Sequence, residues 1–116
     1  MLSGDELVHI QSAVANISVD EAIVDYMLAI VEKTRAHEAL SLGVSPRGAQ
    51  ALYRAAQALA ILEGRGYVIP DDVKRLAIPV CAHRVVVNPR VALANRSADW
   101  ADRTLQEILT LIDVPL

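Results

Sequence analysis

The chain has 116 residues, a net charge of −3, one cysteine and 53% hydrophobic residues, with no phenylalanine. This length suits one domain, the acidic balance argues against general nucleic-acid binding, and a single cysteine excludes a disulfide framework and a cysteine-based metal site. Charges interrupt every apolar run before the ~20 residues of a membrane span, and no secretory signal is visible at the start. We therefore expect a cytoplasmic domain in which Cys81 is a small buried apolar residue.

The high apolar content has two interpretations. An alanine-rich core raises the apolar count while adding little side-chain volume. Alternatively, a small helical domain with this much apolar surface carries a face that a partner covers. Composition leaves both interpretations open.

Two early stretches have the S-x-x-E spacing of a capping box, which predicts two helix starts. Ser3 caps the first predicted helix, which runs to about Ala15, and Ser18 caps the second, which runs to about Arg35. Residues 36–44 are predicted to be a loop that ends in a glycine turn.

The third predicted helix, over residues 46–63, begins with a charge of the wrong sign. Ser45 is a good N-cap and Pro46 suits the first helical position. Arg47 comes next, although a helix N-terminus disfavours a cation by up to about 1 kcal/mol. Arg47 is therefore either a solvated surface arginine or the neighbour of a bound anion, because helix N-termini bind phosphate.

A fourth helix is predicted to begin at Pro70, after a short extended segment over residues 67–69. Ile69 is a poor N-cap, so Asp72 or the preceding turn has to satisfy the free N–H groups of the first turn. Pro79 is predicted to kink or restart this helix, which then continues to about residue 84.

The last third of the chain has weaker signals. Residues 85–87 are β-branched and strand-like, residues 88–97 are predicted to be a loop, and a final helix is expected over residues 99–113. Trp100 is either a core anchor or a contact for a partner. Together these patterns predict an all-α domain, a small bundle of about five helices with short extended segments near 67–69 and 85–87.

No catalytic or metal-binding residue is predicted within the chain. The spacing of Gly43 and Gly48 suggests a phosphate loop, but Ala49 and Gln50 stand where its lysine and hydroxyl residue are needed. The three histidines, together with the cysteine, lack metal-ligand spacing; they are His9, His37 and His83.

Several short motifs nevertheless occur in the same order as in a known protein family. They resemble the C-terminal lid of MoxR-family AAA+ ATPases and read Thr34-Arg35, Leu42-Gly43-Val44-Ser45-Pro46-Arg47, Ala55-Ala56 with Ala58 and Ala60, Gly64-Arg65-Gly66-Tyr67-Val68, Pro70-Asp71-Asp72-Val73 and His83-Arg84. The resemblance covers essentially the whole chain and is most specific between Leu40 and Arg84. It implies that residues 1–116 are one lid domain excised from a larger ATPase.

The resemblance assigns a role to one residue above all. Arg47 stands at the position of the sensor-2 arginine, which reaches from the lid to the γ-phosphate of ATP bound on the core. Arg35 and Arg65 are secondary candidates for contact with the nucleotide or with a neighbouring subunit. The alternative for both is a helix-end charge that interacts with the last carbonyls of its helix. ATP and Mg are expected only in the full-length protein, and the fragment alone is expected to bind neither and to show no ATPase activity.

The resemblance also implies partners: the protein's own AAA+ core, neighbouring subunits of a hexameric ring, and a protein with a von Willebrand A-type domain. The implied activity is chaperone-like remodelling driven by nucleotide. Two alternatives stay open, a free-standing helical module that binds a protein through its apolar face and the lid of another AAA+ branch.

Overall fold

A computed structural model describes residues 4–90 and 100–115 of the chain, and only the backbone of residues 6–11. The described residues form five α-helices, one short 3-10 helix and two short strands. In chain order these are α1 (Gly4–Ala15), α2 (Glu21–Ala36), β1 (Leu40–Leu42), α3 (Pro46–Leu62), α4 (Pro70–Cys81), η1 (Ala82–Arg84), β2 (Val86–Val87) and α6 (Trp100–Leu111). The predicted all-α class is confirmed.

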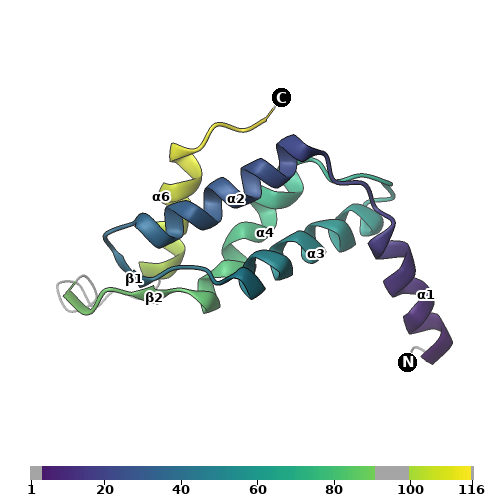
Figure 1. Cartoon of the computed structure of the whole chain (residues 1–116), viewed down its shortest axis with the longest axis horizontal. Helices are drawn as coiled ribbons and strands as arrows, with labels where there is room; N and C mark the ends of the chain where they lie inside the picture. Colours follow the sequence, from purple (N-terminus) through teal and green to yellow (C-terminus); the bar gives the residue numbers. More distant parts are fainter. Residues whose placement is uncertain (1–3, 91–99, 116) are drawn as a thin grey trace.

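Helices α2, α3 and α4 lie side by side, and α6 packs against α2 and α4 at one end (Figure 1). α1 projects from the opposite end, where it contacts α3. The domain measures 50 × 36 × 21 Å. Its radius of gyration of 15.7 Å exceeds the roughly 13 Å of a compact chain of this length, because α1 extends away from the other helices. In the described part of the chain no helix is both long enough and apolar enough to cross a membrane.

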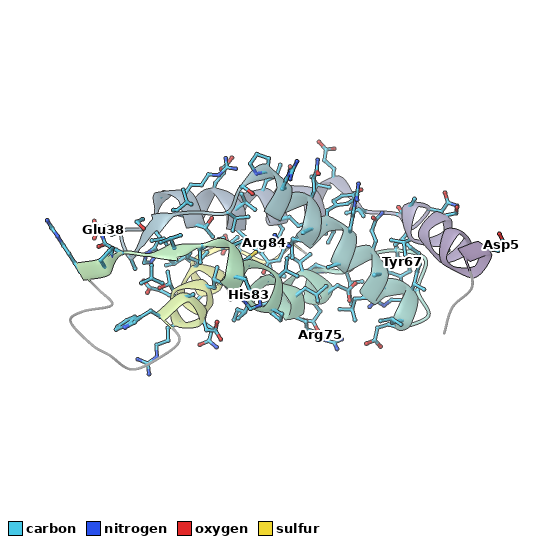
Figure 2. All side chains as sticks on the ribbon, turned by 90° about the horizontal axis from the view of Figure 1, so that it is seen from below. Asp5, Glu38, Tyr67, Arg75, His83 and Arg84 are labelled. Atoms are coloured by element: carbon cyan, nitrogen blue, oxygen red, sulfur yellow. The ribbon has the colours of Figure 1, made fainter. Side chains whose placement is uncertain are left out.

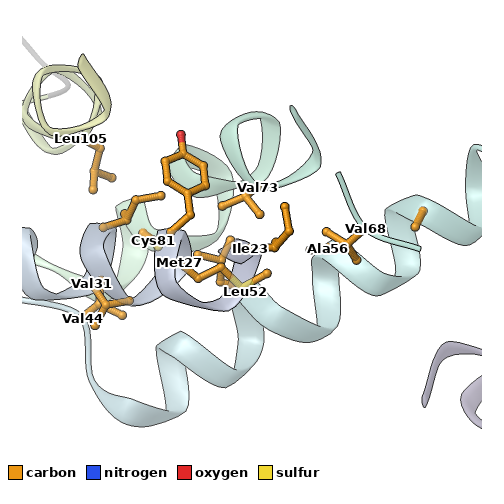
Figure 3. Packing of buried hydrophobic residues seen from close by; sticks show 13 residues of the cluster. Ile23, Met27, Val31, Val44, Leu52, Ala56, Val68, Val73, Cys81 and Leu105 are labelled. Atoms are coloured by element: carbon orange, nitrogen blue, oxygen red, sulfur yellow. The ribbon is translucent and has the colours of Figure 1, made fainter. Parts of the chain in front are cut away.

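The core lies between α2, α3, α4 and α6. Each contributes a side chain with no exposed surface, respectively Ile30, Leu52, Val73 and Leu105; Figure 3 shows the last three. The small alanine side chains of α3 allow α4 to approach closely, since Ala56 and Ala60 are fully buried and the two helices make extensive contact. Cys81 is buried in the same cluster, as predicted.

One predicted loop is partly wrong. Residues 40–42, inside the predicted loop 36–44, form strand β1, which pairs antiparallel with β2 through Leu40 opposite Val87 and Leu42 opposite Val86. The Asn88 N–H extends this ribbon by donating to the Ala39 carbonyl at 2.7 Å. A pairing partner more than forty residues away leaves no local signal in the sequence, so the loop prediction missed it. The strand-like interpretation of 85–87 is confirmed over Val86–Val87.

The prediction that Ser18 caps the second helix is wrong. α2 begins at Glu21 behind Asp20, and Ser18 instead pairs with the extended segment that precedes α4. The Ser18 N–H donates to the Gly66 carbonyl at 3.0 Å, and the Val68 N–H donates to the Ser18 carbonyl at 2.9 Å. This backbone pairing holds Ser18 in an extended conformation, so the helix starts later.

Two further boundaries were predicted in part. α4 continues through Pro79 to Cys81, so the predicted restart is wrong, while helical structure continues to Arg84 as the 3-10 helix η1, as predicted. Arg75, whose carbonyl loses its partner at Pro79, is exposed, so water can satisfy that group. Pro89 and Arg90 are helical rather than loop, Asn88 before them is outside any helix as predicted, and residues 91–97 of the predicted loop fall outside the described residues. α3 ends at Leu62, one residue before the predicted end, and Gly64 turns the chain there with a positive φ of 75°.

Candidate functional site

The N-terminus of α3 has the predicted local structure. Ser45 is the N-cap and its Oγ accepts a hydrogen bond from the Gly48 N–H at 3.2 Å. Pro46 occupies the first helical position and Arg47 the second, with no acidic residue in the first turn. Arg47 is exposed, and the ion pairs found among the described residues do not include it. The cap of Ser45 is confirmed; that of Ser3 falls outside the described residues.

The chain just before this helix is fastened to the last turn of α2. The Val44 N–H donates to Thr34 Oγ1 at 2.9 Å, and Arg35 Nε donates to the Val44 carbonyl at 2.9 Å. Consecutive residues of α2 thus satisfy both polar backbone groups of one buried residue. Arg35, a predicted secondary contact, therefore has one donor engaged inside the domain.

Two glycines leave room for close neighbours, which are backbone atoms at Gly43 and side-chain atoms at Gly48. A Cβ on Gly43 would lie 2.6 Å from the Arg35 backbone nitrogen and 2.7 Å from the Thr34 carbonyl carbon, so no side chain fits there. A Cβ on Gly48 would lie 2.7 Å from Val44 Cγ1 and 3.0 Å from Arg84 Cδ. The stem of Arg84 therefore lies against the first turn of α3.

A hollow of about 630 Å³ opens beside this helix start. Its lining includes three basic side chains and, among the described residues, no acidic one: Arg35, His83, Arg84, Ser41, Leu42, Gly43, Val44, Ser45 and Pro46. Figure 2 shows His83 and Arg84 together at the end of α4, where η1 leads into β2. The topology thus brings basic residues from α2 and η1 to the start of α3, which already carries Arg47.

Arg65, the other secondary candidate, is bound within the domain. Its guanidinium makes two hydrogen bonds to Asp72, at 2.6 and 2.7 Å, and a third to the Tyr67 carbonyl at 3.0 Å. The bond to Asp72 raises the pKa of Arg65 further. Arg65 thus ties the turn after α3 to the start of α4, and no described carbonyl of the last turn of α3 accepts from its side chain.

Asp72 satisfies a free backbone N–H at the start of α4, which is one of the two alternatives predicted from the sequence. Its carboxylate accepts from the Ile69 N–H at 2.9 Å and so satisfies the backbone donor of the N-cap residue, as the third helical residue does in a capping box. Burial alone would raise the pKa of Asp72, but the hydrogen bonds from Arg65 and Ile69 outweigh it and hold this pKa below its ordinary value. The carboxylate is therefore charged and fully engaged.

His37 and Cys81 lie outside the hollow and have partners or burial within the domain. His37 accepts from the Ala39 N–H through Nδ1 at 3.0 Å, and its Nε2 lies 3.5 Å from Glu107 Oε1. Burial raises the pKa of Cys81 to about 11, against an opposing effect of Arg84. No three metal-binding side chains gather within the described part of the chain. Trp100 is half-buried with Arg103 above its ring, 5.7 Å from the centroid.

Sequence reasoning missed the roles of Thr34 and Arg84. A signal for Thr34 was present, because a buried hydroxyl at the end of an apolar helix face needs a partner, and Gly43 marks a close backbone approach nearby. Arg84 gave no such signal, since its contact with Gly48 depends on how η1 packs against α3.

Comparison with known proteins gives a consistent result. Residues 32–108 match the family model of the AAA lid domain. The chain is 39% identical over 116 residues to the Bacillus subtilis protein YeaC, covering all of this chain and 35% of that protein. It is 38% identical over 96 residues to the Mycobacterium tuberculosis "Chaperone MoxR1", covering 75% of this chain and 26% of that protein.

A solved structure of another protein is similar in fold to this chain. The crystal structure of a "putative ATPase" from Cytophaga hutchinsonii superposes with a TM-score of 0.86 at 25% identity, over 97% of this chain and 36% of that one. The chain thus covers only about a quarter to a third of the length of these two relatives, since the shares are 26% and 35%.

Proposed function

Because the chain belongs to the AAA lid domain family, in its MoxR branch, we propose that residues 1–116 are the C-terminal lid of an ATPase whose nucleotide-binding core is a separate domain of the same protein. The coverage supports this arrangement, because the relatives are about three times longer than the aligned region. The Walker lysine, the magnesium-site acid and the arginine finger would belong to that core, which would hold ATP and Mg.

Within this proposal Arg47 is the sensor-2 arginine. The observation that carries it is an exposed arginine at the second position of a capped helix whose first turn has no acid. The guanidinium has five donors in a planar fork, which suits phosphoryl oxygens. The neighbouring hollow adds basic side chains and, among the described residues, no carboxylate to compete. A cation there would stabilise charge on the transferring phosphoryl group and link lid position to nucleotide state.

The proposal extends to assembly. Seven large apolar side chains are exposed among the described residues, and they give the lid apolar surface for its own core and for neighbouring subunits of a ring: Leu28, Leu42, Leu62, Tyr67, Val86, Leu111 and Val114. Such a ring, a hexamer, would act as a chaperone-like motor, beside a partner with a von Willebrand A-type domain. Because it consumes ATP, we place it in the cytoplasm.

The test is Arg47→Ala in the protein with its core. We expect unchanged folding and a loss of ATP turnover of about 10²-fold, the size typical for removal of one transition-state donor. Arg54→Ala is the matched control, because Arg54 is exposed on the same helix two turns further along. Turnover that stays the same in Arg47→Ala would remove the sensor role.

A further inference from the structure

The residue before the N-cap of α3 is held from two sides. Val44 has no exposed surface, and its N–H and carbonyl bind Thr34 Oγ1 and Arg35 Nε, each at 2.9 Å. Thr34 has no exposed surface either, and its hydroxyl proton goes to the Val31 carbonyl at 2.6 Å. With its proton committed to α2, the hydroxyl presents a lone pair to Val44.

Close packing around Val44 restricts movement of the backbone that its two hydrogen bonds hold. Gly43 sits so close to the backbone of Thr34 and Arg35 that a Cβ there would overlap it. Val31 and Val44 both belong to the core cluster (Figure 3). The path of the chain from β1 into α3 is therefore set by the last turn of α2.

Arg47 lies three residues beyond Val44, within the first turn of α3. On this geometry we infer that Thr34 is a positioning residue for Arg47, with Arg35 as a second fastening. The inference rests on the sensor role proposed for Arg47. A valine would fill the site of Thr34 equally well, but it would leave the Val44 N–H buried and unpaired. The start of α3 would then shift, and a misplacement of about 1 Å reduces the contribution of a catalytic group severely.

Thr34→Val in the protein with its core tests the inference. We expect the kcat of ATP hydrolysis to fall about tenfold while the KM for ATP stays within about twofold, because the lost interaction is one made in the transition state. Thr34→Ser keeps the hydroxyl and should stay within about twofold of the natural protein. Gln57→Leu is the control, since it removes another buried side-chain bond, from Gln57 Nε2 to the Ile17 carbonyl, far along α3; its kcat should not change.

A double variant separates positioning from general weakening. If Thr34 acts through Arg47, the variant with both Thr34→Val and Arg47→Ala should be no slower than Arg47→Ala alone, within about twofold. Losses that multiply would overturn the inference while leaving the sensor role in place. Unchanged turnover in Arg47→Ala would overturn both.

Arg35→Ala supplies the second variant if Thr34→Val does not fold. Arg35 is exposed, so its removal should leave the domain folded. We expect a lower kcat, an unchanged ATP affinity, and no further loss when it is combined with Arg47→Ala. A weaker ATP affinity that adds to the effect of Arg47→Ala would mean direct contact with nucleotide and would overturn the positioning role.

Discussion

Helices α3 and α4 both begin with a proline at the first helical position, yet their N-termini are completed in opposite ways. α4 has acids in its first turn, and Asp72 binds the Ile69 N–H and the Arg65 guanidinium. α3 has Ser45 as a neutral cap and Arg47 in its first turn, exposed and without an ion pair among the described residues. We call these the closed start and the open start.

The difference is between a helix start that is completed within the domain and one that fits the binding role proposed for Arg47. The positive end of α4 is neutralised by its own domain, so nothing is left for a ligand. The positive end of α3 is reinforced by Arg47 and by the basic hollow beside it, which is an arrangement that an anion from elsewhere would complete. The last turn of α2 supports this helix start through the hydrogen bonds of Thr34 and Arg35 to Val44.

The largest effect is expected from Gly43→Ala, which attacks the support of the open start. The added Cβ meets main-chain atoms at 2.6–2.7 Å, and main chain cannot move aside, so we expect a loss of about 3 kcal/mol in the free energy of unfolding. Denaturant unfolding measures it. Gly66→Ala is the control, because no described atom apart from its chain neighbours lies within 4 Å of a Cβ placed there; an equal loss there would show that the close approach is unimportant.

Asp72→Ala removes the key group of the closed start. It leaves the Arg65 guanidinium and the Ile69 N–H without their partner, so we expect a loss of about 2 kcal/mol. The matched change at the open start, Ser45→Ala, removes one neutral hydrogen bond and should cost about 1 kcal/mol. Thermal unfolding compares the two. A larger loss for Ser45→Ala would reverse the assignment of closed and open starts.

Acid should weaken the closed start selectively. The folded-state pKa of Asp72 lies below its unfolded value, so the contribution of Asp72 is fully present above a pH of about 4 and is lost as the pH falls through the folded-state pKa. Stability measured against pH should therefore drop less steeply below a pH of about 4 in Asp72→Asn than in the natural chain. Identical acid limbs would contradict the charged state of this carboxylate.

The smallest change in stability is expected at Arg47, and it tests most directly how the open start differs from the closed start. Arg47→Glu places an acid where the dipole of α3 favours one, so we expect stability to rise by about 0.5 kcal/mol while ATP turnover in the protein with its core collapses. A gain in stability with a loss of activity is typical of a functional residue that the fold does not need. Lost stability in this variant would place Arg47 among the structural residues.

How far the sequence could predict this molecule depended on the range of the interactions. The cap of Ser45, the end of α3 just before Gly64 and the role of Asp72 at the start of α4 were all predictable, because each depends on residues a few positions apart. Ser18 and strand β1 were mispredicted, because each takes a backbone partner from more than forty residues away.

In the candidate site, too, the features that depend on neighbouring residues were predictable and the contacts between separate helices were not. The sequence by itself determined the charge conflict at Arg47, since the dipole of a helix and the sign of an arginine are local properties. Only the tertiary structure decided what surrounds it: Thr34 and Arg35 holding Val44, Arg84 lying against Gly48, and Arg65 turned to Asp72. These contacts depend on how separate helices pack, and packing is a property of the whole chain that no single stretch of it encodes.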